Sequence, residues 1–483
     1  MSWLARKPDE PEPVEHSMHR YLGPWHLTFM GVGGTIGAGI FVLSGTVAAN
    51  YAGPGVAISY LLAAVGCVCA ALCYAEFASM SPVAGSAYLY TYRSLGEFPA
   101  WMIGWTLILE YLFSAATVAV GWSGYFGGLL RSLGVTLPAS IAAAPLSFSP
   151  QSGLSASGSL VNLPAVLMTV LIGAVLARGI SLSAAVNAVL MFLKVGIILA
   201  VVTLGAAYVS PDNWTPFIPP NQGEFGQFGW SGVLRGAGVV FFAYVGFDMI
   251  STAAQESRNP QRDLPIGLIA TLLICALLYV SMALVMTGLA PYARLAVPNP
   301  IMVALDQAGD ALDWLSPLVA VAAVVGLASA LMMSMYGQTR VFLAMARDGL
   351  LPTALARLHP ARRTPTAGTW IVVLLVGVAA AFLPVQLLGE LASIGTLLAF
   401  AVVCVGVMAL RRREPSAIRR FRLPGGDAIP VAGIVSCFAL MATLPAETWW
   451  RLIAWSALGV ALYLAYGSTR STLALKARGL PAE

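Results

Sequence analysis

Long apolar segments recur along the whole chain, and twelve of them reach about 20 residues, the length that a helix needs to cross the hydrocarbon core of a bilayer. Hydrophobic residues make up 58% of the chain and charged residues only 10%, whereas a soluble domain carries about 25% charged residues. The sequence therefore predicts an all-α integral membrane protein with twelve transmembrane helices. The expected segments are 24–50, 54–79, 98–129, 160–178, 183–209, 229–256, 264–290, 314–341, 366–384, 388–410, 429–446 and 448–468.

The basic residues predict the orientation of these segments. Placing the N-terminus inside assigns most of the 26 lysines and arginines to the inner side, including the run RRREPSAIRRFR. The outer loops then keep only Arg131, Arg294 and Arg451, as the positive-inside rule requires. The tails 1–23 and 469–483 are therefore expected in the cytoplasm of a multi-pass protein of the inner (plasma) membrane. The net charge of +5 reflects this topology and gives no reason to expect a nucleic-acid partner.

Residues that could carry catalysis or bind a metal are few. The six cysteines lie in apolar segments without a metal-ligand spacing, and the four histidines lie outside the helix centres. No nucleophile constellation accompanies them, so we expect neither an enzyme nor a bound cofactor. The residues in question are Cys67, Cys69, Cys73, Cys275, Cys404, Cys437, His16, His19, His26 and His359.

Glycine interrupts the first apolar segment, because five of the nine residues from Gly31 to Gly39 are glycine. Each glycine inside a helix costs roughly 0.5–1 kcal/mol relative to alanine. In hydrocarbon, a broken helix survives only where protein or a wet cavity satisfies the freed backbone groups. A break at mid-membrane therefore indicates a binding site built from backbone, and close helix packing through small residues is the alternative.

A second interruption, GAGVVFFAYVGFD at 236–248, lies five segments later. Because an odd number of spans reverses topology, the first five and the next five segments can form two inverted repeats. This predicts a transporter core over 24–410, with repeats at about 24–209 and 229–410 and two further helices in 429–468. Interrupted helices at matching places in two repeats are typical of the substrate site of secondary transporters.

Three motifs resemble one known family. GTIGAGIFVLSG at 34–45 resembles the first-helix motif of the amino acid–polyamine–organocation superfamily. FFAYVGFDMISTAAQESRNPQRDLP at 241–265 and MYGQTRVFLAMARDGLLP at 335–352 are similar to the sixth and eighth helices, with their following loops, of its cationic amino acid transporter branch. The resemblance covers residues 20 to 468 and implies the leucine-transporter-type fold with broken first and sixth helices.

The resemblance also implies how the two breaks hold an amino acid. The N-terminal end of a half-helix offers unpaired N–H groups to an anion, and the opposite end offers carbonyl groups to a cation. The carboxylate would lie on N–H groups, and the α-ammonium on carbonyl groups of both breaks. Phe242 would be the gate over the substrate, with packing as the alternative for this aromatic stripe. The residues implied are Gly37, Ala38 and Gly39 for the carboxylate and Thr35, Ile36, Phe242, Ala243 and Val245 for the ammonium.

Acidic residues within the apolar segments are further candidates. An ionised aspartate at the centre of a membrane helix costs roughly 2.5–3.5 kcal/mol on insertion scales, so Asp248 is expected to cap a half-helix, bind a cationic side chain or titrate. Glu110 either lines the same cavity or hydrogen-bonds a neighbouring helix. Glu76 and Glu256 lie near inner ends, where a structural or gating role is favoured.

Lys194 lies deep in the fifth segment, within MFLKVGIIL. Burial disfavours the charged form of a lysine. The resemblance implies that its ammonium replaces the second sodium ion of sodium-driven relatives, with contacts to carbonyls near Gly33 and Gly34 and to a small residue such as Ser329. Loss of its proton would release the first helix, which favours protons over sodium as the coupling ion. A salt bridge with Glu110 is the alternative.

Together these features predict a secondary active transporter of L-amino acids, cationic or small and neutral, that works by alternating access as a proton-coupled symporter. An exchanger of amino acids or polyamines is the first alternative, and an amino-acid-binding membrane sensor is the second. Beyond the substrate and the lipid bilayer, a small single-span subunit and the oligomeric state are left open.

Overall fold

The computed structural model describes residues 22–80, 87–149, 153–179, 184–248, 250, 257–360, 362, 364–415, 419, 421–423 and 425–477. Within these residues the chain is predominantly helical, as predicted, and contains one two-stranded antiparallel sheet. Glu256 and most of the expected N-terminal tail lie outside the described residues.

The helices follow in chain order. The first half contains α1 (Pro24–Thr35), the π-helical turns η2 (Gly39–Leu43) and η3 (Ala48–Ala52) on either side of α2 (Ser44–Val47), η4 (Gly53–Gly55), α3 (Val56–Met80), α4 (Ala87–Ser94), α5 (Glu97–Ser132), α6 (Ala139–Ala142), α7 (Leu163–Ala177) and α8 (Ala184–Gly205). The second half contains α9 (Gly229–Val240), η7 (Phe241–Tyr244), α11 (Pro260–Leu289), α12 (Pro300–Gln307), α13 (Leu315–Arg347), α14 (Thr366–Phe382), α15 (Val385–Arg413), α16 (Ala428–Thr443), α17 (Ala446–Leu462), η10 (Tyr463–Gly467), α18 (Ser468–Arg470) and α19 (Thr472–Ala477).

Among the described residues, seven helical stretches are long and apolar enough to cross a membrane, and three shorter apolar helices accompany them. The predicted segments 24–50 and 229–256 do not form single long helices, because α1 and α9 each end after 12 residues. The count of twelve spans therefore stays a prediction. The seven stretches are Gly39–Phe77, Glu97–Ser132, Ala188–Tyr208, Gln261–Leu289, Leu315–Arg347, Val385–Arg413 and Ala446–Lys476.

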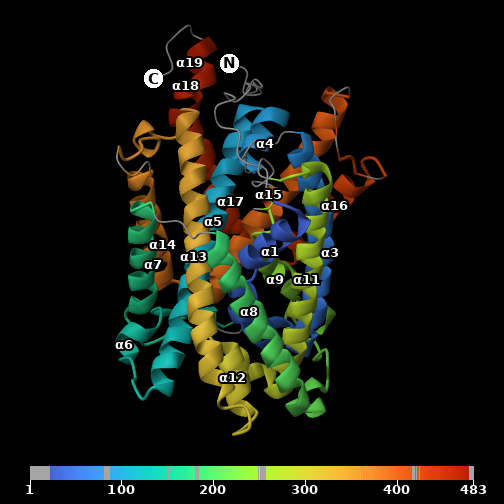
Figure 1. Ribbon diagram of the computed structural model, residues 1–483, viewed down its shortest axis with the longest axis vertical. Coiled ribbons are helices and arrows are strands. Elements are labelled where there is room, and N and C mark those ends of the chain that lie inside the picture. The colour runs from blue at the N-terminus through green and yellow to red at the C-terminus, as the bar shows by residue number, and fades with distance from the viewer. Residues whose placement is uncertain are drawn as a thin grey trace.

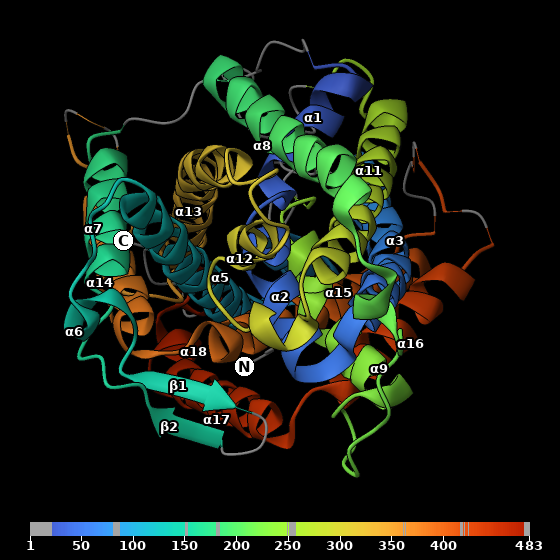
Figure 2. The ribbon, with the colours of Figure 1, turned by 90° about the horizontal axis from the view of Figure 1, so that it is seen from below.

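The long helices run side by side along one axis, with α12 at one end of the bundle and α4, α18 and α19 at the other (Figure 1). Seen along that axis, α2 lies near the middle, surrounded by longer helices such as α3, α5, α11 and α15 (Figure 2). The segment 131–160, expected as a loop, contains α6 and a hairpin of β1 (Leu146–Ser149) and β2 (Gly153–Ala156), in which Leu146 pairs with Ala156. The middle part of the first broken helix thus lies inside the bundle, whereas α1 and α9 lie nearer its rim (Figure 2).

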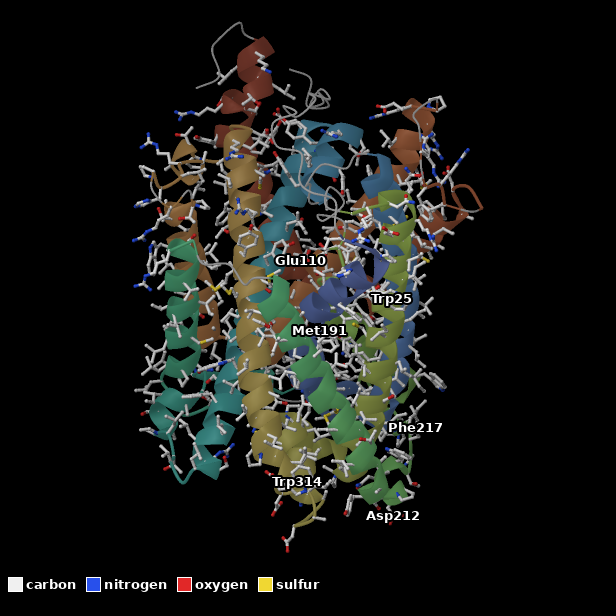
Figure 3. The ribbon with its side chains drawn as sticks, in the orientation of Figure 1. Trp25, Glu110, Met191, Asp212, Phe217 and Trp314 are labelled. Atoms are coloured by element: carbon white, nitrogen blue, oxygen red, sulfur yellow. The ribbon has the colours of Figure 1, made fainter. Side chains whose placement is uncertain are left out.

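Side chains at the periphery and inside the bundle differ as the hydropathy pattern predicts. Trp25 and Trp314 are exposed, with 62% and 57% of their surface accessible, whereas Glu110 is buried at 2%. Glu110 lies inside the bundle, and Trp314 and Asp212 lie near the α12 end (Figure 3). Exposed tryptophans near helix ends suit the interfacial region of a bilayer.

A buried polar cluster, which the sequence analysis did not identify, closes the α12 end of the bundle. Tyr51 donates a hydrogen bond of 2.7 Å to one carboxylate oxygen of Glu390, and Thr448 donates one of 3.0 Å to the other. Gln386 accepts a hydrogen bond from Asn50 at 2.9 Å. Because Glu390 is only 2% exposed, this cluster joins the end of the first broken helix to α15 and α17.

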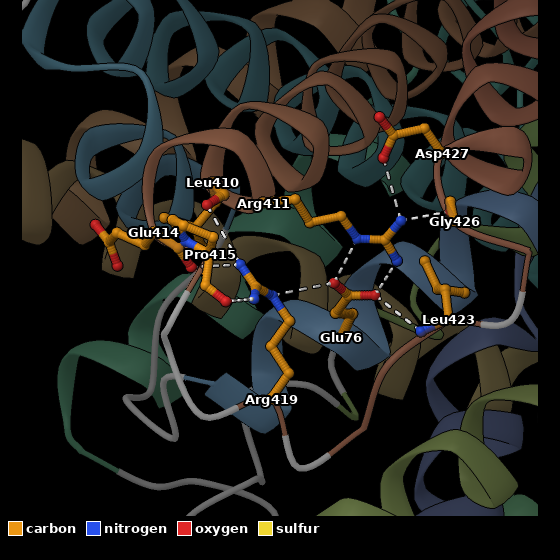
Figure 4. Close-up of polar contacts among 9 residues, drawn as sticks. All are labelled: Glu76, Leu410, Arg411, Glu414, Pro415, Arg419, Leu423, Gly426 and Asp427. Carbon is orange, nitrogen blue, oxygen red and sulfur yellow. Dashed lines mark hydrogen bonds and ion pairs between the residues drawn. The ribbon is translucent and has the colours of Figure 1, made fainter.

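A second buried cluster lies at the opposite end, around Glu76 at the end of α3 (Figure 4). Arg411 donates two hydrogen bonds to the Glu76 carboxylate, at 2.8 and 2.5 Å. The backbone N–H of Leu423 donates a third at 2.9 Å, and Arg419 lies 3.7 Å away. The Glu76 side chain is fully buried, so the expected structural role is consistent with its contacts. It anchors the basic loop between α15 and α16 onto α3.

Replacing Glu76 by alanine is expected to destabilise the protein by about 3–5 kcal/mol, because the buried carboxylate shared by Arg411 and Arg419 is lost and, among the described residues, Arg411 keeps only its ion pair with Asp427. The measurement is thermal unfolding of the purified protein in detergent, followed by tryptophan fluorescence. Arg412→Ala is the matched control, since Arg412 is 71% exposed and its nitrogen lies 3.6 Å from Asp427, a surface pair worth about 0–1 kcal/mol. Equal midpoints for the two variants would contradict the anchoring role.

Candidate functional site

The first helix break lies where the glycine pattern predicts it. Helix α1 ends at Thr35, and Ile36 has an extended backbone with φ −71° and ψ 103°. Helical structure resumes at Gly39 and continues through η2, α2 and η3. The first N–H groups of a helix have no partner within it, so the restart at Gly39 directs unpaired donors towards the break.

The second break lies just after α9. The chain tightens into the 3₁₀ turn η7 over Phe241–Tyr244 and then follows a turn through Asp248. Gly246 has φ +110°, a left-handed backbone conformation that favours glycine. Its N–H donates a hydrogen bond of 3.2 Å to Asp248 Oδ1. Asp248 is therefore involved in shaping the break itself.

The two breaks cross at backbone contact distance, which explains two of the glycines. A Cβ atom on Gly39 would lie 2.3 Å from the Cα of Ala243, and one on Gly246 would lie 2.8 Å from the carbonyl oxygen of Gly34. Close packing and a broken backbone are thus both present here. The glycines allow two interrupted segments to touch through their main chains.

Side chains from the surrounding helices satisfy the carbonyl groups that the breaks release. The hydroxyl of Tyr279 on α11 lies 3.1 Å from the Thr35 carbonyl oxygen and 2.8 Å from that of Ala243. Tyr60 on α3 donates to the Gly39 carbonyl at 2.8 Å. Tyr279 thus bridges the two breaks, a role that the sequence analysis missed.

Lys194 on α8 is 1% exposed, and its ammonium donates to two carbonyl groups of the first break. The distances from Nζ are 3.1 Å to Gly33 O and 2.9 Å to Ile36 O. The prediction named Gly33 and Gly34, so the second carbonyl lies two residues further on. The lysine is held by carbonyl dipoles, and within the described part of the chain no ion pair joins it to Glu110.

Helix α13 makes room for the lysine through a glycine. A Cβ atom on Gly326 would lie 2.9 Å from Lys194 Cγ and 3.1 Å from its Cε. The Ser329 hydroxyl donates to the Gly326 carbonyl at 2.7 Å. The small α13 residue in contact with the lysine stem is therefore Gly326, and Ser329 braces the turn that contains it.

A pocket opens beside the crossing of the two breaks and encloses about 510 Å³ between its atoms, including space open to solvent. Its walls come from the two breaks, from α5 and from α13. The residues that line it are Gly34, Thr35, Gly37, Ala38, Gly39, Tyr111, Ser114, Val118, Phe242, Val245, Gly246, Asp248, Ala330, Met333 and Ser334.

Most of the predicted substrate residues lie in this wall, but not all. Ile36 and Ala243 do not line the pocket, and their carbonyls accept hydrogen bonds from Lys194 and Tyr279. Glu110 lies outside the wall, close enough to Asp248 for their charges to interact. Lys194 and Ser329 do not line the pocket either.

Of the aromatic stripe in the second break, only Phe242 lines the pocket. Phe241 packs edge-on against Phe400, with ring centroids 5.6 Å apart, and Phe247 packs against the same ring at 5.3 Å. Tyr244 packs against Tyr60 and Tyr279. The packing alternative thus describes three of the four aromatic residues, and Phe242 alone is placed to contact a substrate.

The sequence analysis did not single out the α5 and α13 walls. Tyr111, Ser114 and Val118 follow one another at spacings of three and four residues, and so form one face of α5. Met333 and Ser334 belong to α13. The spacing of Tyr111, Ser114 and Val118 shows that they share one face of α5. No sequence signal indicates that this face, and not another face of the buried helix, meets the breaks.

Comparisons with known proteins agree with this architecture. The chain matches the amino acid permease family over residues 22–463. It is 42% identical over 460 residues to the branched-chain amino acid permease BcaP of Bacillus subtilis, covering 95% of each chain. It is 40% identical to the methylthioribose transporter of the same organism over 98% of this chain and 99% of that one. It is 37% identical to the vacuolar cationic amino acid transporter 4 of Arabidopsis thaliana, over 83% and 65% of the two chains.

The fold and the pocket define a polytopic membrane transport protein. The chain belongs to the amino acid permease family, within the amino acid–polyamine–organocation superfamily. It is accordingly a permease and not an enzyme, and its substrate site is expected where the two breaks meet.

Replacing Tyr279 by phenylalanine is expected to destabilise the ligand-free protein by about 1–3 kcal/mol, because the Thr35 and Ala243 carbonyls lose the single O–H that they share as donor. Thr287→Val on the same helix is the control, since the Thr287 hydroxyl donates at 2.8 Å to the carbonyl of Ala283, four residues earlier in its own helix. Thermal unfolding of both variants in detergent measures the difference. An equal or smaller effect at Tyr279 would contradict its bridging role.

Proposed function

We propose that this permease is a secondary active transporter that moves L-amino acids across the plasma membrane by alternating access, with protons as the coupling ion. The observation that carries the proposal is the crossing of two helix breaks at one pocket, with Lys194 holding the first break through two carbonyls. Relatives named as amino acid permeases and cationic amino acid transporters support an amino acid as the substrate.

In this proposal twelve helices cross the membrane, and α1 and α9 begin two inverted repeats at about 24–209 and 229–410. Both termini lie in the cytoplasm, together with α4 and the arginine-rich loop around Glu76. The positive-inside rule supports this orientation, since Arg411 and Arg419 belong to that loop. The α12 end, with the Glu390 cluster, then faces outwards.

The substrate carboxylate lies, in this proposal, on the N–H groups at Gly37, Ala38 and Gly39, where helical structure resumes. The α-ammonium lies among carbonyl groups of the two breaks, including that of Val245. The Thr35 and Ala243 carbonyls already accept from Tyr279, but a carbonyl oxygen has two lone pairs and can accept a second donor. Phe242 covers the bound amino acid.

The pocket wall favours a short neutral side chain over a cationic one. Its apolar part comes from Val118, Val245, Ala330 and Met333. The acid in the wall, Asp248, already accepts a hydrogen bond from Gly246 within the break, and an acid that shapes the site is less available to a cationic side chain. The similarity to a branched-chain permease supports a neutral side chain.

Methylthioribose is a second candidate substrate, favoured by the 40% identity to a transporter of that name. It is a neutral sugar with a thioether, and it has no carboxylate or ammonium. It would therefore leave the backbone donors of the first break without an anion. Binding of this compound in place of amino acids would replace the first proposal.

The position of Lys194 supports the proposed coupling. While protonated, it ties α8 to the first break at Gly33 and Ile36. Loss of the proton removes the charge that orders these carbonyls and favours a second arrangement of α1. A membrane potential of about 100 mV adds roughly 2.3 kcal/mol to the driving force for each positive charge moved inward. This is enough to accumulate a neutral amino acid that enters together with one proton.

The test of the substrate is a thermal-shift screen of the purified protein against the twenty amino acids, polyamines and methylthioribose at two pH values. A ligand at about 100 times its Kd stabilises the native state by about 2.7 kcal/mol. We expect short neutral amino acids to raise the midpoint most. Stabilisation by methylthioribose alone would contradict amino acid transport, and stabilisation chiefly by arginine and lysine would contradict the neutral preference.

Lys194→Met is expected to remove most of the pH dependence of amino acid uptake into proteoliposomes, because the ammonium that holds the first break is lost while Asp248 and Glu110 stay in place. Coupling free energies of allosteric linkage correspond to about 5–150-fold changes in affinity. The change in substrate affinity between the two pH values, which the variant loses, should therefore lie in this range. Counterflow exchange of unlabelled for labelled substrate serves as the folding control. Unaltered pH dependence in a variant that still exchanges substrate would overturn the coupling role.

A further inference from the structure

Two hydroxyl groups in the pocket wall are buried and find no hydrogen-bond partner among the residues that the structure describes. They are Oγ of Ser114 on α5 and Oγ1 of Thr35 at the end of α1. Both residues line the pocket, and they are only 3% and 4% exposed. A buried hydroxyl without a hydrogen-bond partner is energetically unfavourable. A hydrogen-bonding group on a bound ligand would remove that cost.

Ser114 is unusual among the hydroxyls of its own helix. Serine and threonine in helices commonly donate to the carbonyl four residues earlier, as Thr106 and Thr117 do here at 2.8 and 2.7 Å. Ser123 donates to Asn162 at 2.7 Å, and Ser132 donates to Leu129 at the same distance. Each of the four other serine or threonine hydroxyls of α5 thus has an acceptor, and Ser114 is the exception at the pocket.

The surroundings of Ser114 indicate what a substrate would bring to it. Val118 lies one turn further along α5 and also lines the pocket, with Met333 and Ala330 from α13. These apolar groups and the Ser114 hydroxyl line the same pocket. A hydroxyl among them discriminates strongly between a substrate that offers a hydrogen bond and one of equal shape that does not, because the latter leaves the protein group unpaired.

We propose that Ser114, supported by Thr35, is a specificity-determining residue that selects amino acids with a short hydroxyl-bearing side chain over hydrocarbon side chains of the same shape. The substrate class is therefore small neutral β-hydroxy amino acids, of which threonine and serine are the examples. The inference rests on the proposed amino acid transport and deepens it. It assigns the side-chain subsite to the α5 wall of the pocket.

The experiment compares two pairs of matched substrates, threonine with valine and serine with alanine, in proteoliposome uptake. The wild type is expected to prefer the hydroxylated member of each pair. Ser114→Ala is expected to lower the threonine-to-valine ratio of kcat/KM roughly tenfold, the size of one neutral hydrogen bond, mainly through KM. Thr35→Val should act in the same direction. Thr46→Val is the control, because Thr46 is equally buried and unpartnered but does not line the pocket.

The possible results separate the alternatives. If Ser114→Ala lowers kcat/KM equally for threonine and valine, Ser114 contacts the carboxylate or ammonium that all substrates share. If the threonine-to-valine ratio is unchanged, the hydroxyl binds only water. Either result overturns the inference and leaves amino acid transport intact. Wild-type protein that transports no amino acid overturns the proposed function itself. The ligand-free thermal midpoint of Ser114→Ala should not fall, since no partner is lost. A clear fall would reveal a structural bond and contradict the inference.

Discussion

The freed backbone of two interrupted helices is the constraint on which the rest of the structure depends. Carbonyl and N–H groups released inside an apolar bundle must find partners, because no bulk water reaches them. The neighbouring helices supply donors for the carbonyls, namely the hydroxyls of Tyr60 and Tyr279 and the ammonium of Lys194. In the proposed function, the N–H groups at Gly37, Ala38 and Gly39 take their partner from the substrate carboxylate.

The same constraint explains why several distant residues act as one unit. Gly39 and Gly246 allow the two breaks to cross, Gly326 leaves space for the lysine stem, and Tyr279 bridges the crossing. Rigid anchors hold the surrounding shell at both ends, through Glu390 on one side and Glu76 on the other. An alternating-access cycle in the proposed function would have to release one of these anchors at a time while the crossing is kept.

The sequence predicted the parts of this site that depend on local pattern. The glycine cluster located the first break, and the run of small residues at 236–248 located the second. The contact of Lys194 with first-helix carbonyls came from the family resemblance and not from local pattern. The sequence could not predict which carbonyls accept from Lys194. The Ile36 carbonyl becomes available to the lysine only because the backbone is extended after Thr35. Tyr279 and Glu390 were missed because each has a partner in the first broken helix, 244 and 339 residues away in the chain. The Ser114 wall was missed because helix rotation is set by tertiary packing.

The most direct measurement of the central claim is hydrogen–deuterium exchange at the first break, with a transported amino acid and with its α-carboxamide as the control ligand. If the N–H groups of Gly37, Ala38 and Gly39 bind the carboxylate, the amino acid slows exchange in peptides covering 34–43, and the carboxamide, which lacks the negative charge, does not. Equal protection by both ligands, or unchanged exchange at 34–43 under saturating amino acid, would contradict the account.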